Sequence, residues 1–315
     1  MYRTTQPLFL FCETPLHAGT GSDLGIIDLP IQRERHTGYP KIESSSLKGS
    51  LREAFERRPG ISLEKVHRVF GFDSDSANGL TDAGQFFEDK KNREFSGCIA
   101  VTDARLLLFP VKSHKGVFAW ITCHRVVGRF LQDLKEFCKI EDPMLSVLQE
   151  NSASSKASIW LSDGKIGLEE YVFENITTDD STISNFGGWI ASNLFNDPEN
   201  FWADKLTKDI VVLSDEDFAD FVQHSTEVIT RNKIDNETGT VSDTALFTEE
   251  FLPSESLLYS LALFAPEFSK KQGKMTENDA EKFFNENLPP VFQIGGDASL
   301  GKGIVRTKKT PTAKS

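Results

Sequence analysis

The chain has 315 residues, and 38% of them are hydrophobic, so it can bury a substantial core in one large or two modest domains. Its formal net charge of −12, taken alone, argues against a nucleic-acid-binding protein. No apolar run reaches the roughly 18 residues of a membrane span, and the N-terminus lacks the features of a signal peptide. We therefore expect a cytoplasmic protein that does not enter a membrane.

The first predicted elements are a strand over residues 7–12, a glycine-rich irregular stretch over 17–28 and a helix after residue 44. A serine at position 44, 45 or 46 is expected to cap this helix. Its apolar face consists of Leu47, Leu51, Ala54 and Phe55. Lys48 and Arg52 lie one turn apart on another face, which also carries Arg57 and Arg58, so that face is a candidate for binding phosphates.

The central part of the chain alternates between strand and helix patterns. Strands are predicted over 98–104, 106–110, 117–122, 210–213, 256–264 and 291–294, and helices over 124–139, 184–195, 216–223 and 277–287. In the helix over 124–139, the residues expected to face inward are Val127, Phe130, Leu131, Leu134 and Phe137. Residues 227–234 and 245–251 flank a turn-forming segment and predict a β-hairpin with a long tip. This mixture indicates the α+β class.

A glycine-rich segment lies near the C-terminus: Gln293-Ile-Gly-Gly-Asp-Ala-Ser-Leu-Gly-Lys-Gly-Ile-Val-Arg306. Its glycines, with Lys302 among them, are typical of a loop whose N–H groups converge on a phosphate. Residues 296–302 fit Gly-x-x-x-x-Gly-Lys, but Gly303 stands where a P-loop has Ser or Thr, and too little chain follows for the P-loop helix. Two interpretations remain, a plain glycine turn between strands and a loop that grips a phosphodiester backbone, and we favour the second.

Charge is distributed unevenly along the chain. Seven Lys or Arg and four Glu lie in residues 31–60, and five Lys or Arg and one Asp lie in residues 295–315. If these two stretches fold together, they form one basic groove for a polyanion. Residues 168–220 hold thirteen acidic residues and two lysines, and the sequence gives this block no role. The four cysteines include no Cys-x-x-Cys pair and are predicted to be reduced core thiols.

Taken in order, several of these stretches resemble the RAMP superfamily of CRISPR proteins, and within it the backbone subunits (subunit four) of the type III-B effector, the Cmr complex. The matching blocks are the loop from His17, Gly25-Ile-Ile-Asp-Leu-Pro-Ile-Gln-Arg-Glu34, His36-Thr-Gly-Tyr-Pro40, Ser46-Leu-Lys-Gly49 with Arg52, residues 101–111, Ile234-Asp235, Thr238-Gly239, Leu246-Phe-Thr-Glu-Glu250 and the glycine-rich segment.

The resemblance implies a ferredoxin-like core, akin to an RNA-recognition motif, in a single domain over residues 1–306. Insertions are expected at about 60–97 and 140–208, with a thumb hairpin at 231–251, and residues 307–315 are expected to form a disordered tail. The thumb residues Ile234, Val241, Leu246 and Phe247 either wedge apart a base step or belong to the core.

The resemblance also implies an activity. Copies of such a subunit stack head-to-tail along a guide RNA, together with other Cmr subunits, and target single-stranded RNA is cut at regular intervals by a metal-dependent reaction in antiviral defence. The residue tied to cutting is Asp28. At pH 7 an ordinary Asp is a weak base, so we expect Asp28 to hold Mg²⁺ or to orient the 2′-OH. For Asp28 the alternative is a solvated loop carboxylate.

Several other residues have more than one interpretation or no assigned role. His17 is a candidate general acid or substrate-positioning group, or else an imidazole bonded to backbone, and the same alternatives hold for His36, for which we favour the structural one. Asp23 is a candidate second metal ligand. Glu227 and Asp235 are expected to be solvated, and Arg105 and Arg125 are left without a role.

Guide RNA is expected to contact Ser46, Lys48, Arg52 and Lys302, and the backbone at Gly295, Gly296, Gly301 and Gly303. Two further functions stay open: a non-catalytic RNA-binding filament subunit, and a nuclease that processes the guide precursor.

Overall fold

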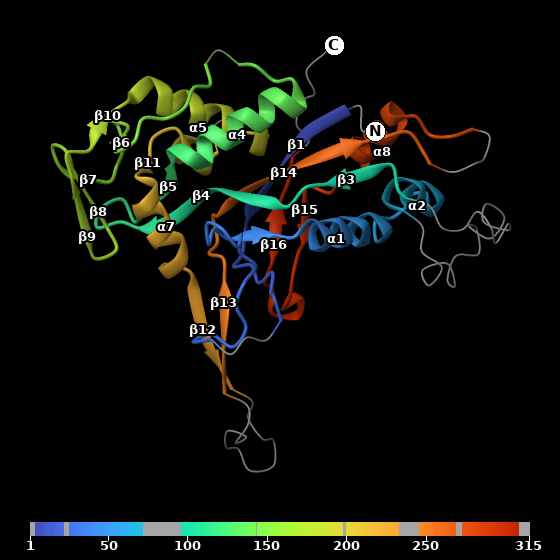
Figure 1. Cartoon of the computed structure of the whole chain (residues 1–315), viewed down its shortest axis with the longest axis horizontal. Coiled ribbons are helices and arrows are strands. Elements are labelled where there is room, and N and C mark those ends of the chain that lie inside the picture. Colours follow the sequence, from blue (N-terminus) through green and yellow to red (C-terminus); the bar gives the residue numbers. More distant parts are fainter. Residues whose placement is uncertain are drawn as a thin grey trace.

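The computed structural model describes residues 4–21, 25–71, 96–142, 144–197, 200–232, 246–268 and 273–308. Over these residues the chain has a mixed α/β fold built on one 11-stranded sheet, with a separate three-stranded sheet and a two-stranded hairpin (Figure 1). Among the described helices, none combines the length and the apolar character that crossing a bilayer requires.

The large sheet joins the two ends of the chain. Strand β1 (Thr4–Cys12) pairs antiparallel with β14 (Leu257–Phe264) on one side and with β16 (Ile304–Arg306) on the other, and β15 (Val291–Gln293) follows β16. Since β16 is the last part of the glycine-rich segment, this pairing brings the glycines of that segment beside the residues that follow β1.

On the other side of β14 the sheet continues through five strands. They are β4 (Ala104–Lys112), β5 (Phe118–Cys123), β11 (Ile210–Leu213), β6 (Ser152–Ala153) and β10 (Thr177–Thr178). Two short strands lie off this path, β2 (Lys41–Ile42) against β4 and β3 (Ile99–Val101) against β14. The sheet is mixed, because β11 runs parallel to β5 and β10 runs parallel to β6.

Helices cover both faces of the sheet, and β1 shows how its sequence serves both. Successive side chains of a strand point to opposite faces. On one face, Phe9 contacts Phe130 of α4 (His124–Asp133) and Trp189 of α5 (Asp180–Leu194). On the other, Gln6 bonds Asn285 of α8 (Glu277–Asn287). A strand buried on both faces reads as a continuous apolar run, as residues 8–12 do.

Helix α8 packs with α1 (Ser44–Glu56) and α2 (Leu63–Phe70) through aromatic contacts. The Phe55 ring lies 5.0 Å from that of Phe70 and 5.5 Å from that of Phe284. The predicted apolar face of α1 is confirmed, because Leu47, Leu51 and Phe55 are fully buried.

The remaining elements are two small sheets and two helices. The three-stranded sheet consists of β7 (Trp160–Ser162), β8 (Lys165–Leu168) and β9 (Tyr171–Glu174), and two helices, α6 (Phe201–Leu206) and α7 (Asp215–His224), complete this side. The predicted hairpin forms from β12 (Glu227–Arg231) and β13 (Phe247–Phe251), and Figure 1 shows it projecting from the body of the protein. The acidic block of residues 168–220 includes β9, α5, α6 and part of α7.

Two sequence predictions are wrong in detail. Residues 44–46 do not cap α1, because the cap position is Glu43 and the Ser44 N–H donates to the Asp103 carboxylate (2.9 Å) from a distant turn. Phe137 is not inward but 48% exposed. A π-helical turn, η3 (Leu134–Cys138), follows α4 and breaks the 3.6-residue periodicity on which that prediction depended.

Candidate functional site

Asp28 is exposed and is held by the strand β13. Its carboxylate oxygen Oδ2 accepts from the Thr248 N–H (2.7 Å) and from the Thr248 hydroxyl (2.9 Å), and the Asp28 N–H donates to Thr248 Oγ1 (3.0 Å). The next residue, Leu29, bridges to Glu249 in parallel, with two backbone hydrogen bonds of 3.0 Å to Thr248 and Glu250. Residues 28–29 therefore lie along β13 like a short added strand.

These bonds define the charge state of Asp28. The Thr248 N–H, followed by the Thr248 hydroxyl, lowers the pKa of the Asp28 carboxyl below its ordinary value. Oδ2 takes both of these bonds. The group is thus an anion at neutral pH, suited to binding a cation or orienting a hydroxyl and poorly suited to removing a proton.

His17 lies along the same strand. Its Nδ1 donates to the Glu250 carbonyl (2.7 Å), its Nε2 lies 3.7 Å from Glu249 Oε1, and its ring packs against Phe251. Asp28 and His17 therefore engage positions two residues apart on β13, roughly 7 Å along a strand. His17 is only 9% exposed and bonded to backbone. Its role as a general acid stays a prediction.

The glycine-rich segment docks on the residues around His17. The Gly296 N–H donates to the His17 carbonyl (2.9 Å) and the Gly303 N–H to the Pro15 carbonyl (2.9 Å). Gly295 has a φ of +85°, and a Cβ there would lie 2.1 Å from the His17 carbonyl oxygen. Glycine at this position is therefore required both by conformation and by close approach.

The segment does not offer a free row of N–H groups. Besides the two bonds to residues 15–17, the N–H groups of Leu300, Gly301 and Lys302 donate to carbonyls of Asp297 and Ala298, at 2.9–3.2 Å. These five donors are therefore not the phosphate cradle that the sequence suggested. The RNA-binding assignment of Gly295, Gly296, Gly301 and Gly303 stays a prediction that depends on Lys302 and on close backbone approach.

A partly buried charge cluster links this segment to the hairpin, and sequence reasoning missed it. Arg231 of β12 lies 2.7 Å from Glu249 Oε2 and 2.8 Å from Asp297 Oδ2. Burial, and then the nearby Asp297, raise the pKa of Glu249. The Lys302 Nζ lies 4.9 Å from the centre of the Phe251 ring. Arg, Asp and Glu are common on any protein surface, so these residues carry no signal in the sequence. Their pairing across long sequence separations becomes visible only in the structure.

The start of α1 joins the same region through Gln32. The Gln32 amide donates to the Gly19 carbonyl (3.1 Å) and to Ser46 Oγ (3.5 Å), and it accepts from the Glu43 N–H (2.7 Å). Continuous contacts thus connect Asp28, His17, the glycine-rich segment and the first turn of α1. Residues 15–19 and Gln32 thus link the glycine-rich segment to the first turn of α1. That Lys48, Arg52 and Lys302 form one basic surface beside Asp28 stays a prediction.

Lys48 and Arg52 share a face of α1 as predicted, but their environments differ. Arg52 is held by Glu56 (2.8 Å) and by His67 Nδ1 (3.1 Å). Lys48 is half-buried, and burial followed by repulsion from Arg52 lowers its pKa. An anion that binds beside a lysine whose pKa is lowered in this way stabilises the charged form of that lysine.

Not every predicted residue can be placed. Asp23, Ile234, Asp235 and Val241 lie outside the described residues. Leu246 is 70% exposed, in line with a contact surface rather than the core. Within the described ranges, no three His, Cys, Asp or Glu side chains gather as metal ligands.

Glu227 departs from its prediction as a solvated carboxylate. It is half-buried at the base of the hairpin, and burial raises its pKa, which the nearby Lys302 partly offsets.

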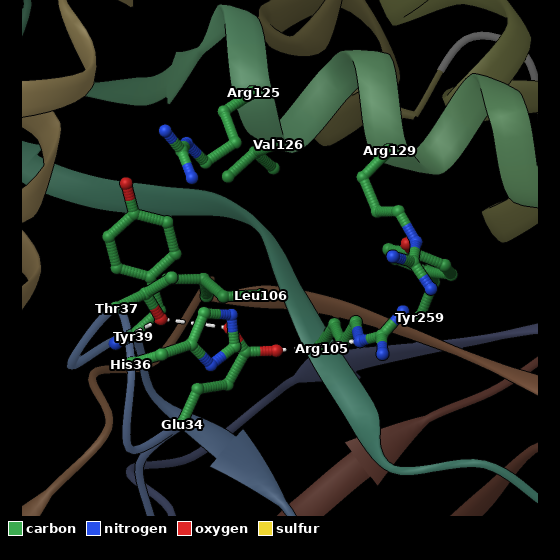
Figure 2. Close-up of a pocket in the computed structure, with 10 residues that line it drawn as sticks. All are labelled: Glu34, His36, Thr37, Tyr39, Arg105, Leu106, Arg125, Val126, Arg129 and Tyr259. Carbon is green, nitrogen blue, oxygen red and sulfur yellow. Dashed lines mark hydrogen bonds and ion pairs between the residues drawn. The ribbon is translucent and has the colours of Figure 1, made fainter.

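A separate cavity of about 230 Å³ lies between α4 and residues 34–39 (Figure 2). Figure 2 shows Arg125 on one side of this cavity, and Arg105 and Arg129 together on the other. Arg105 (3.3 Å) and Arg129 (3.0 Å) both pair with the buried Asp133, which also accepts from the Tyr259 hydroxyl. Arg125 pairs with Asp215 (3.2 Å).

Since each of these guanidinium groups pairs with a carboxylate of the same chain, we interpret the cavity as part of an ion-pair network. Arg105 and Arg125 thereby gain structural partners. His36 borders the cavity and is largely exposed, with its Nε2 3.9 Å from Glu34.

The chain belongs to the RAMP superfamily, whose sequence model matches residues 10–306. It is 34% identical over 297 residues to the CRISPR system Cmr endoribonuclease Cmr4 of Pyrococcus furiosus, covering 94% of this chain and 92% of that protein. It is 25% identical over 328 residues to the CRISPR system CMR subunit Cmr4 of Saccharolobus solfataricus, covering 98% and 97%.

Solved structures agree with this assignment. The crystal structure of oligomeric Cmr4 from Pyrococcus furiosus superimposes with a TM-score of 0.68 at 28% identity, covering 97% of this chain and 98% of that one. A chain of the type III-B Cmr-beta complex bound to cognate target RNA has a TM-score of 0.69 at 19% identity, covering 98% and 97%, which shows a shared fold. The family predicted from the sequence is therefore confirmed.

Proposed function

We propose that this chain is a guide-RNA-binding backbone subunit of a type III-B CRISPR ribonucleoprotein, and that it cleaves complementary target RNA at regular intervals in antiviral defence. Its similarity to the Cmr4 proteins supports this, because it extends over nearly the whole chain. The observation that carries the proposal is the exposed Asp28 carboxylate, held by Thr248 of the hairpin strand β13.

The core of the fold is ferredoxin-like. The order β1-α1-β4-β14-α8-β16 along the chain gives a βαββαβ unit. Its strands lie side by side as β16-β1-β14-β4, and all neighbouring pairs are antiparallel. The insertion expected at about 140–208 falls in the segment between β4 and β14, and the hairpin β12–β13 near the end of that segment is the proposed thumb.

In cleavage, the RNA 2′-oxygen bonds to the adjacent phosphorus while the bond from that phosphorus to the 5′-oxygen of the next nucleotide breaks. The 2′-OH loses its proton to water and the departing 5′-oxygen takes a proton from water. A displaced nucleotide bends the backbone toward in-line geometry. Asp28 orients the hydroxyl or holds Mg²⁺, which when bound neutralises charge that develops on the phosphate. A single exposed carboxylate fits Mg²⁺, since this ion commonly binds one or two carboxylates together with substrate phosphates and water.

The guide RNA follows the basic surface of the protein. Lys48, Arg52 and Lys302 neutralise its phosphates, and Ser46 adds a hydroxyl contact. Leu246 and Phe247, together with the hairpin tip, separate a base step. Further copies stack head-to-tail through an open heterologous interface, with other Cmr subunits at the ends.

The test is Asp28→Asn in a ribonucleoprotein reconstituted with guide RNA, with the exposed Asp163→Asn as a matched control. We expect D28N to assemble and bind target RNA normally but to lose cleavage, whereas D163N cuts like the wild type. If D28N cuts every site at the normal rate, the subunit orders the guide without cutting. Incubating the free subunit with repeat RNA tests the remaining possibility, processing of the guide precursor.

A further inference from the structure

The contact between Asp28 and Thr248 is reciprocal. Three hydrogen bonds of 2.7–3.0 Å join two residues that are 220 positions apart in the sequence. The Thr248 hydroxyl takes part in two of them, accepting from the Asp28 N–H and donating to Oδ2. Both the backbone and the side chain of Asp28 are thus fixed by one residue.

We propose that Thr248 is a positioning residue for RNA cleavage: it fixes one oxygen and the N–H of Asp28, so that the other carboxylate oxygen is held ready for the RNA. This inference depends on the proposed function of Asp28. An exposed Asp on a loop otherwise samples several χ1 rotamers, and selecting the one rotamer that can act costs conformational entropy. Holding the group in one geometry beforehand removes that cost from the reaction.

The hydroxyl of Thr248 can be removed without releasing the segment. Leu29 keeps its two backbone bonds to β13, and the Ile31 N–H keeps its bond to Glu250 Oε2 (3.0 Å). Arg33 keeps its ion pair with Glu250 (2.5 Å). Substituting Thr248 therefore changes how Asp28 is held and leaves the path of the chain in place.

Thr248 also connects Asp28 to the hairpin. It pairs with Thr230 across β12–β13, in the strands that lead to the hairpin tip. Asp28 is therefore held by a strand of the hairpin itself. The cutting residue is thereby set by the same element that is proposed to separate the bases.

The competing interpretation is that threonine is present only because β-branched residues favour strands. Valine distinguishes the two, since it keeps the branched shape and the backbone N–H but lacks the hydroxyl. Serine is the complementary variant, because it keeps the hydroxyl and lacks the methyl group.

The experiment compares Thr248→Val, Thr248→Ser and Asp28→Asn in the reconstituted complex. For T248V we expect unchanged RNA affinity and a single-turnover cleavage rate lower by about tenfold, the effect of one hydrogen bond to a charged group. T248S should cleave at close to the wild-type rate. Equal rates for T248V and the wild type would overturn the positioning role.

Hydrogen–deuterium exchange of the free subunit gives a readout that does not depend on cleavage. The Asp28 N–H should exchange faster in T248V, where its acceptor is missing, and at the wild-type rate in T248S. If D28N still cuts, the proposed function fails, although the exchange result can still stand. If D28N is inactive while T248V matches the wild type in both rate and exchange, only the role of Thr248 fails. If T248V unfolds at a lower urea concentration than the wild type, Thr248→Ala takes its place in both the cleavage and the exchange measurements.

Discussion

The glycine at position 295 lies against the backbone of His17, so closely that a Cβ on Gly295 would be 2.1 Å from the His17 carbonyl oxygen. The next N–H, that of Gly296, donates to the same oxygen at 2.9 Å. The C-terminal segment is thus fastened to the residue that also contacts β13. This contact fixes the relative positions of Lys302 and the loop that carries Asp28.

Alanine at this position should therefore destabilise the protein strongly. Gly295→Ala combines a positive φ with a backbone clash, and we expect a loss of about 2–4 kcal/mol in the free energy of unfolding, measured by urea denaturation. Gly301 is the matched control, because it has a φ of +72° but open space around its Cα. Gly301→Ala should lose only about 1 kcal/mol. Equal losses in the two variants would mean that the approach to His17 is not tight.

Basic residues at the shared surface should determine the salt dependence of RNA binding. In the variant with Lys48, Arg52 and Lys302 all changed to Ala, we expect the slope of log K against log salt to fall by about 0.7 per lost phosphate contact. The control changes three surface lysines that pair with acidic neighbours, Lys135, Lys165 and Lys208. Both proteins lose the same charge, so an identical slope in the two would remove the guide-binding assignment.

The start of α1 should respond to pH through Asp103. Although burial opposes it, hydrogen bonds from Lys41 and the Ser44 N–H lower the pKa of the Asp103 carboxyl below its ordinary 3.8. Asp103→Asn should cost about 1 kcal/mol at neutral pH, a small value because solvent partly screens the group.

The sign of this pH effect follows from the lowered pKa. A carboxyl whose pKa is lowered in the folded state stabilises it above the unfolded-state pKa, and this contribution disappears as the pH falls through the folded-state pKa. The difference in the free energy of unfolding between wild type and D103N, measured by urea denaturation, should stay constant from pH 7 to about 5 and shrink below about 4. A difference that grows in acid would contradict the assignment.

Periodic patterns predicted the elements that they describe. The bounds of β11 (Ile210–Leu213) and α8 (Glu277–Asn287) agree with the sequence prediction. β11 is an uninterrupted apolar run, as expected of a strand that is fully buried, and the buried residues of α8 repeat at the helical spacing i, i+3, i+4. The β-hairpin was predicted from the turn-forming segment that separates its two strands. The short strands β6, β7 and β10 were missed, since two or three residues are too few to show a period.

The sequence by itself determined the family, the α+β character, the apolar face of α1 and the identity of Asp28 and the basic residues as candidates. These depend on local runs and ordered motifs, which are readable along one dimension. Only the tertiary structure decided that Thr248 holds Asp28, that His17 is enclosed by the glycine-rich segment and that Gln32 ties α1 to both. Each of those contacts joins a side chain to a backbone group or residue far away in the chain, and their strength depends on distance and burial, which no spacing along the sequence encodes.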